Sequence, residues 1–326
     1  MAPGAEDRRY GVDARPRRRR AVGIFTDRDV ALPGGSAPTV RAQRGSKGNV
    51  CHVFPRGGKV GAVPDEVVLP GGIVNAGAVV RSGRYLLRPS TPYTGAVHRL
   101  LRHVRAAGCA GVPEPVGIDV DGRERLVFIE GDVPTPPYPH WSQTDGALVS
   151  VTELLARFHA SLAEYAVAPD DAWSEELADP ASGTMICHND VCLENVVFRD
   201  GRAVALLDFE LAAPGRPLYD LAQLARGWVP VDDDLSAYRL GWTPADRPAR
   251  LRLVSDAYGL DEAARVELVD TLDTAIACDG EFVRRRVARG DAGFVRMWQE
   301  MGGMERIDRR RRWWSANRDR FLASLA

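Results

Sequence analysis

The sequence predicts an α+β fold, in which a small antiparallel sheet with one helix precedes a larger helical part. Between residues 66 and 131, short apolar runs alternate with turn signals, as in β-hairpins. Four prolines between residues 134 and 139 form a stiff, non-helical connector. Beyond it, apolar residues recur at helical spacing. We therefore expect a sheet-containing lobe over 61–132 and a helical lobe over 133–326.

The composition is that of a globular protein, because 45% of the 326 residues are hydrophobic and 27% are charged. No apolar run approaches the ~20 residues of a membrane helix, and no secretory signal is recognisable, so no membrane association is expected. The net charge of −1 gives no general attraction to nucleic acid. Five cysteines without a CxxC pair argue against a disulfide framework and are typical of the cytoplasm. The sequence indicates no particular oligomeric state.

Residues 1–60 are expected to form a disordered extension. The block Arg15–Arg20 is a run of like charge interrupted by one proline, which favours a solvated tail. Contact with a polyanion is the alternative interpretation of the same run.

In the sheet-containing lobe, apolar runs predict the strands and a 3.6-residue period predicts the helix. We expect a strand at Val67–Leu69, a hairpin turning at Ser82–Gly83, a helix over 94–107, and a second hairpin turning at Asp121–Gly122. In the helical lobe, we expect core-facing apolar positions at Leu148, Val151, Leu154, Leu155, Phe158, Leu162, Leu218, Leu221, Leu224, Leu268, Leu272 and Ile276.

The segment from residue 185 to residue 210 carries the chemistry. A strand at Val196–Phe198 is followed by a turn at Asp200–Gly201 and a return strand at 203–207. With a two-residue turn, Arg199 pairs with Arg202. The segment is therefore a tight hairpin.

Counting back along this hairpin predicts a cluster of oxygen-bearing side chains. Asn195 then faces Leu206, and Asp208 lies beside Leu193, close to Asp190. Two carboxylates and one amide are ligands of the kind that Mg²⁺ prefers. Phosphoryl transfer needs such a cluster, because it depends mainly on positioning and on charge neutralisation.

This segment resembles the motif of the aminoglycoside phosphotransferase family, H-x-D-x-x-x-x-N followed further along by D-[FW]-[DE]. The residues that match are His188, Asp190, Asn195, Asp208, Phe209 and Glu210. The resemblance spans roughly residues 66–326 and implies a bilobal, protein-kinase-like fold. It also implies phosphoryl transfer from ATP or GTP to a hydroxyl of a small molecule, without identifying that acceptor.

The resemblance also implies roles for individual residues. Asp190 and His188 belong to the catalytic loop, Asp190 as the base and His188 as a residue that stabilises the loop. Asn195 and Asp208 are the expected Mg²⁺ ligands. Asp220 is expected to brace the catalytic loop.

The expected nucleotide site lies in the sheet-containing lobe. A glycine pair between two strands offers backbone N–H groups that can cradle phosphate. An arginine stands at the end of a strand where the kinase-like fold carries a phosphate-binding lysine, and residues 128–131 resemble the hinge that binds the base. These expectations assign the nucleotide to Gly71, Gly72, Asn75, Arg88, Glu130 and Gly131.

The expected helix of the sheet-containing lobe also departs from the family pattern. The helix over 94–107 has no glutamate to pair with Arg88 and offers His98 and His103 instead. This departure, together with arginine in place of the family's lysine, supports an alternative interpretation, a catalytically silent kinase-like protein that only binds a nucleotide or another ligand. A protein kinase is disfavoured, because the Asp-Phe-Gly and Ala-Pro-Glu signatures are missing.

Other polar residues have plain structural interpretations. We expect Glu194 to face solvent and His159 to be a satisfied core histidine. Cys187 is expected in a buried strand. A zinc site formed by Cys187, His188 and Cys192 is disfavoured, because no fourth ligand lies nearby. The run Asp232–Asp234 is interpreted as a solvated helix cap, or alternatively as an acidic lip of the acceptor pocket.

Overall fold

The structure is a computed structural model that describes residues 66–69, 73 and 77–325. The chain divides into two units, residues 1–60 and residues 61–326, and every described residue belongs to the second. Three residues of the expected phosphate cradle, Gly71, Gly72 and Asn75, lie outside the described residues, as does the block Arg15–Arg20.

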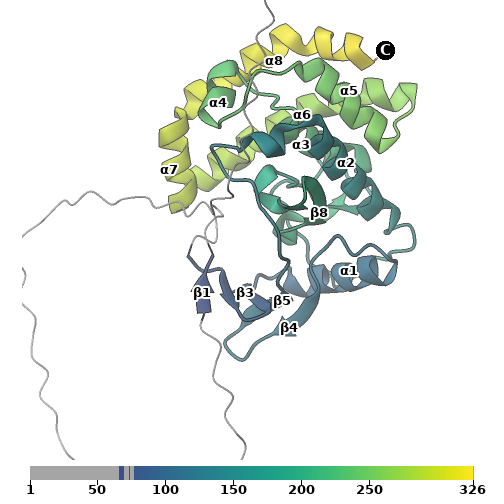
Figure 1. The fold of residues 1–326 in the computed structure, drawn as a ribbon, viewed down its shortest axis with the longest axis vertical. Coiled ribbons are helices and arrows are strands. Elements are labelled where there is room, and N and C mark those ends of the chain that lie inside the picture. The colour runs from purple at the N-terminus through teal and green to yellow at the C-terminus, as the bar shows by residue number, and fades with distance from the viewer. Residues whose placement is uncertain (1–65, 70–72, 74–76, 326) are drawn as a thin grey trace, which may run out of the picture. The chain divides into compact units, whose positions relative to one another are not determined.

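The first described part is an antiparallel sheet of five strands in the order β1-β2-β3-β5-β4, with one helix, α1 (Figure 1). The sequence predicted both the sheet and its helix. The first hairpin turns one residue later than expected, because Ser82 pairs with Tyr85 and Gly83 has a positive φ of 60°. The elements are β1 Glu66–Val68, β2 Val80–Ser82, β3 Tyr85–Pro89, α1 Thr94–Ala106, β4 Pro115–Ile118 and β5 Arg123–Val127.

The remainder is mainly helical, with two small two-stranded sheets, β6-β9 and β7-β8. Helix α2 packs against α5, α3 packs against α6, and α5 packs against α8 (Figure 1). The helices are α2 Asp145–Ala160, α3 Pro217–Trp228, α4 Asp234–Arg239, α5 Arg247–Tyr258, α6 Glu262–Ala288, α7 Ala292–Met301 and α8 Gly303–Leu325. The strands are β6 Met185–Cys187, β7 Val196–Arg199, β8 Arg202–Leu206 and β9 Ala213–Gly215, and the short 3-10 helices are η1 His140–Gln143, η2 Leu193–Asn195 and η3 Phe209–Leu211.

The helical core is built from the apolar faces that the sequence predicted. Helix α2 begins after Thr144, whose side chain caps it by accepting the N–H of Ala147. Its residues Leu148, Val151 and Phe158 are fully buried. None of the described helices combines the length and the apolar composition that crossing a bilayer requires.

The β7–β8 hairpin forms as predicted at its turn. Arg199 pairs with Arg202, and both turn residues have positive φ, as a type I′ turn requires. The register then shifts, because β8 holds one extra residue, Val204, so that Val196 rather than Asn195 faces Leu206. The prediction that Asn195 faces Leu206 was therefore wrong by one position.

Gly131 joins the five-stranded sheet to the β7–β8 hairpin. Its neighbour Asp132 exchanges backbone hydrogen bonds of 2.9 and 2.8 Å with Phe198. Gly131 itself has a φ of 153°, and a Cβ atom there would lie 2.4 Å from Val197 Cγ1 and 2.6 Å from Phe198 O. Only glycine allows the two segments to approach this closely.

We predict that Gly131→Ala lowers the free energy of unfolding by about 1–3 kcal/mol, because the added methyl group overlaps backbone atoms that cannot move aside. Urea denaturation measures the change. Gly227→Ala is the control, since a Cβ atom there, in the last turn of α3, meets nothing within 4 Å. That variant should be neutral or more stable by about 1 kcal/mol. Equal stability of Gly131→Ala and the wild type would contradict the tight contact.

Candidate active site

Asp190 and Asn195 lie in the loop between β6 and β7 and are joined directly. Asn195 Nδ2 donates to the backbone oxygen of Asp190 and to its Oδ2, both at 2.9 Å. Burial, together with the negative charge of Asp208, raises the pKa of Asp190 to about 7. The amide nitrogen of Asn195 is thus committed to Asp190, which leaves its carbonyl oxygen Oδ1 as a ligand atom.

Asp208 is returned to the same loop by the hairpin. The Leu207 N–H donates to Asn195 O at 2.7 Å, which extends the β7–β8 pairing up to the site. Asp208 then adopts a left-handed backbone conformation with a φ of 59°, so the chain turns away from the direction of β8 at this residue. Its carboxylate, 39% exposed, contacts Arg88 Nη1 at 2.8 Å. The structure therefore brings Asp190, Asn195, Asp208 and Arg88 together.

The carboxylate partner of Arg88 comes from a strand. Helix α1 carries no glutamate, as the sequence showed, but Arg88 Nε donates to Glu124 Oε2 from β5. His98, on α1, hydrogen-bonds Glu124 Oε1 at 2.9 Å. Sequence reasoning missed Glu124. The available signal was its place two residues before Leu126, on the buried face of the same strand.

His188 holds the loop and has no free nitrogen. Its ring is fully buried and lies against Phe209, with ring centroids 4.4 Å apart. Nε2 donates to Leu207 O at 2.7 Å, and Nδ1 accepts the Asp190 N–H at 3.2 Å. This pair of bonds needs a neutral imidazole, and burial lowers the pKa of His188 accordingly. His188 is therefore placed to position Asp190 and the strand that leads to Asp208.

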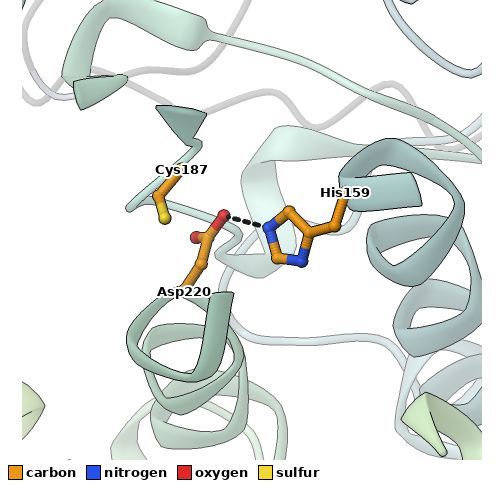
Figure 2. Close-up of side chains that lie close together, drawn as sticks. All are labelled: His159, Cys187 and Asp220. Atoms are coloured by element: carbon orange, nitrogen blue, oxygen red, sulfur yellow. Dashed lines mark hydrogen bonds and ion pairs between the residues drawn. The ribbon is translucent and has the colours of Figure 1, made fainter. Parts of the chain in front are cut away.

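Asp220, at the start of α3, braces the other side of the loop. Its Oδ2 accepts the His188 N–H at 2.7 Å, and its Oδ1 accepts the Asn189 N–H at 2.8 Å. His159 donates from Nε2 to Oδ2 at 2.9 Å (Figure 2) and bonds Tyr258 through Nδ1. Burial alone would raise the pKa of Asp220, but the His159 bond and nearby charges lower it. His159 is the satisfied core histidine that the sequence predicted.

Three buried side chains, two of which belong to this brace, lie close enough together to resemble a metal site. Ligand atoms of His159, Cys187 and Asp220 lie within 4.8 Å of one another (Figure 2). Both oxygens of Asp220 are already used by backbone N–H groups. Burial also raises the pKa of the Cys187 thiol, which favours the protonated form over the thiolate that a metal needs. The cluster is a hydrogen-bonded brace, and the chemistry of its atoms does not fit a metal ion.

Asn195 and Asp208, in contrast, fit magnesium. They offer one amide oxygen and one carboxylate beside Asp190, and such hard oxygen donors are the ligands that Mg²⁺ binds. Arg88 contacts one Asp208 oxygen from the side of the sheet, and the Asp208 carboxylate remains 39% exposed.

Two expectations about nearby acidic residues were wrong. Glu194 is half-buried rather than solvent-facing, and the Tyr138 hydroxyl donates to its two carboxylate oxygens at 3.1 and 3.3 Å. Asp232 and Asp233 are buried rather than solvated, although Asp233 does cap α4 and Asp234 is exposed as expected. Their charges are balanced by arginines of α8, Arg306 with Asp232 at 2.7 Å and Arg309 with Asp233 at 3.1 Å.

The expected hinge residues lie after β5, along β7. The Glu130 carboxylate pairs with Arg81 at 2.5 Å, and its backbone oxygen accepts Arg199 Nε at 2.7 Å. Gly131 packs on Val197. Both residues therefore lie in the connection between the sheet and the β7–β8 hairpin.

We predict that Asp220→Asn lowers the free energy of unfolding by about 2–4 kcal/mol, because an amide cannot accept from two backbone N–H groups and His159 at once. Chemical denaturation followed by tryptophan fluorescence measures the loss. Asp170→Asn, at an exposed position, should stay within about 0.5 kcal/mol of the wild type. Equal stability of the two variants would show that Asp220 does not brace the loop.

Comparison with known proteins identifies a family match over this part of the chain. The profile of the phosphotransferase enzyme family (APH) matches residues 162–254, which include the loop between β6 and β7 and the β7–β8 hairpin. A trifolitoxin immunity protein from Rhizobium leguminosarum bv. trifolii is 35% identical over 215 residues, which are 64% of this chain and 80% of the relative.

Solved structures share the fold at low identity. A choline/ethanolamine kinase family protein from Mesorhizobium loti is 17% identical, with a TM-score of 0.54 over 82% of this chain and 94% of its own. An amicoumacin kinase in complex with AMP-PNP and Ca²⁺ is 14% identical, with a TM-score of 0.53 over 72% of this chain and 87% of its own. The chain belongs to the phosphotransferase enzyme family and has the protein-kinase-like fold of small-molecule kinases.

Proposed function

We propose that this protein transfers the terminal phosphoryl group of ATP or GTP to a hydroxyl group of a small molecule in the cytoplasm. The observation that carries the proposal is the convergence of Asp190, Asn195 and Asp208, through the Asn195–Asp190 bonds of 2.9 Å and the hairpin that returns Asp208. Family membership supports the reaction class.

Each side chain has a role that follows from its place. Asp190 orients the acceptor hydroxyl and takes its proton, while His188 and Asn195 keep its carboxylate in place. Asn195 and Asp208 would hold Mg²⁺, which when bound neutralises negative charge on the phosphates. Arg88 adds a fixed positive charge on the sheet side of the same site.

The nucleotide is proposed to lie between the two lobes, 61–132 and 133–326. The backbone around Gly71, Gly72 and Asn75 would cradle its phosphates, with Arg88 beside them. Glu130 and Gly131 would border the base. The backbone oxygen of Glu130 already accepts from Arg199, so we assign the contact with the base to the other hinge backbone groups.

The alternative of a silent binding protein rested on arginine in place of the family's lysine and on the lack of a glutamate partner for Arg88. Glu124 supplies that partner in the structure, so this reason for expecting inactivity is removed. The proposal does not specify the small molecule that accepts the phosphoryl group. The name of the 35% identical relative adds toxins to the acceptors worth testing.

We predict that Asp190→Asn reduces phosphoryl transfer by about 10²–10⁴-fold while nucleotide binding persists, because only the proton acceptor is removed. Asp208→Asn should instead weaken the binding of Mg-ATP and Mg-GTP. A coupled nucleotide-consumption assay over a panel of metabolites, antibiotics and toxins identifies the acceptor, and isothermal titration calorimetry measures binding.

Asp200→Asn is the matched control in the same hairpin, since Asn-Gly also forms a type I′ turn. This variant should behave as the wild type. Wild-type protein that binds neither Mg-nucleotide and consumes none with any acceptor would contradict the proposed function. Unchanged turnover by Asp190→Asn would contradict the assigned base.

A further inference from the structure

Arg88 and Glu124 form a buried cross-strand pair in the middle of the sheet. The two residues are direct partners in the register of β3 and β5, and they are 8% and 1% exposed. A buried ion pair is tolerated only when its geometry is good and its remaining atoms are hydrogen-bonded. Glu124 meets this condition, because Arg88 binds one of its oxygens and His98 binds the other.

The arrangement fixes the direction of the Arg88 guanidinium. Its Nε faces Glu124, and its Nη1 faces Asp208 at 2.8 Å and Glu210 at 3.3 Å. Among the described residues, Nη2 hydrogen-bonds no acceptor. The planar guanidinium therefore presents Nη2 at the edge of the cluster that contains the proposed metal ligand Asp208.

We propose that Glu124, on strand β5, is the residue that positions Arg88 for the nucleotide phosphates, and that His98 acts through Glu124. The inference rests on the proposed function. Because the carboxylate is borne by the sheet, the register of β3 and β5 orients Arg88, and helix α1 contributes only the hydrogen bond from His98. Arg88 is required at this site rather than lysine, since a lysine ammonium lacks the rigid fork that reaches Glu124 and Asp208 together.

A double-mutant cycle tests this role, with the dissociation constants of Mg-ATP and Mg-GTP measured by isothermal titration calorimetry. The proteins are the wild type, Arg88→Ala, Glu124→Gln and the double variant, each checked for thermal unfolding. Glu124→Gln should weaken binding about tenfold in the wild-type background. In the Arg88→Ala background it should change binding less than about twofold, because no guanidinium remains to be positioned.

Glu281→Gln is the matched control, because Glu281 also pairs with an arginine, Arg284 at 3.0 Å, but on the exposed surface of α6. It should bind nucleotide as the wild type does. His98→Gln should weaken binding less than Glu124→Gln and have no effect when Glu124 is already glutamine. If Glu124→Gln fails to fold, His98→Gln tested with and without Arg88→Ala decides the same question.

Three results would overturn the inference. The first is unchanged binding by folded Glu124→Gln, and the second is an equal loss of binding with and without Arg88, which would mark a purely structural role. In both cases the proposed function would still stand if the wild type binds Mg-nucleotide and Asp208→Asn does not. The third is wild-type protein that binds neither Mg-nucleotide, which overturns the proposed function together with this inference.

Discussion

The buried carboxylate of Asp220 holds the backbone of the catalytic loop. Two consecutive N–H groups, of His188 and Asn189, point at its oxygens, and His159 from α2 completes the set. Helices α2 and α3 thereby define where the loop begins. His188 then transmits this position to both sides of the site, since one ring nitrogen binds the Asp190 N–H and the other binds the backbone next to Asp208. The geometry of the oxygen cluster follows from these contacts.

Charge balance organises the other half of the site. Asp208 and Glu210 face Arg88, and Glu124 and His98 hold Arg88 within the sheet. The sheet and the catalytic hairpin are thus coupled through one guanidinium. Such buried networks stabilise little by themselves, but they restrict their members to one arrangement, which is what positioning a phosphoryl group demands.

The sequence predicted the local features well and the distant pairings poorly. Asp190, Asn195 and Asp208 could be assigned because a short hairpin with a recognisable turn brings them together. The exact register could not be read, since the extra residue Val204 leaves no signal in an apolar strand. The partner of Arg88 was missed because the strand pairing that places Glu124 spans α1, and no local pattern encodes it.

A crystal structure with Mg²⁺ and AMP-PNP tests the central claim most directly. We predict that a magnesium ion is held by Asn195 Oδ1 and an Asp208 carboxylate oxygen, with Asp190 facing the terminal phosphate. Asp208→Asn crystals should lack this ion. A metal bound instead among His159, Cys187 and Asp220, or nucleotide phosphates bound away from Asp208, would contradict the account.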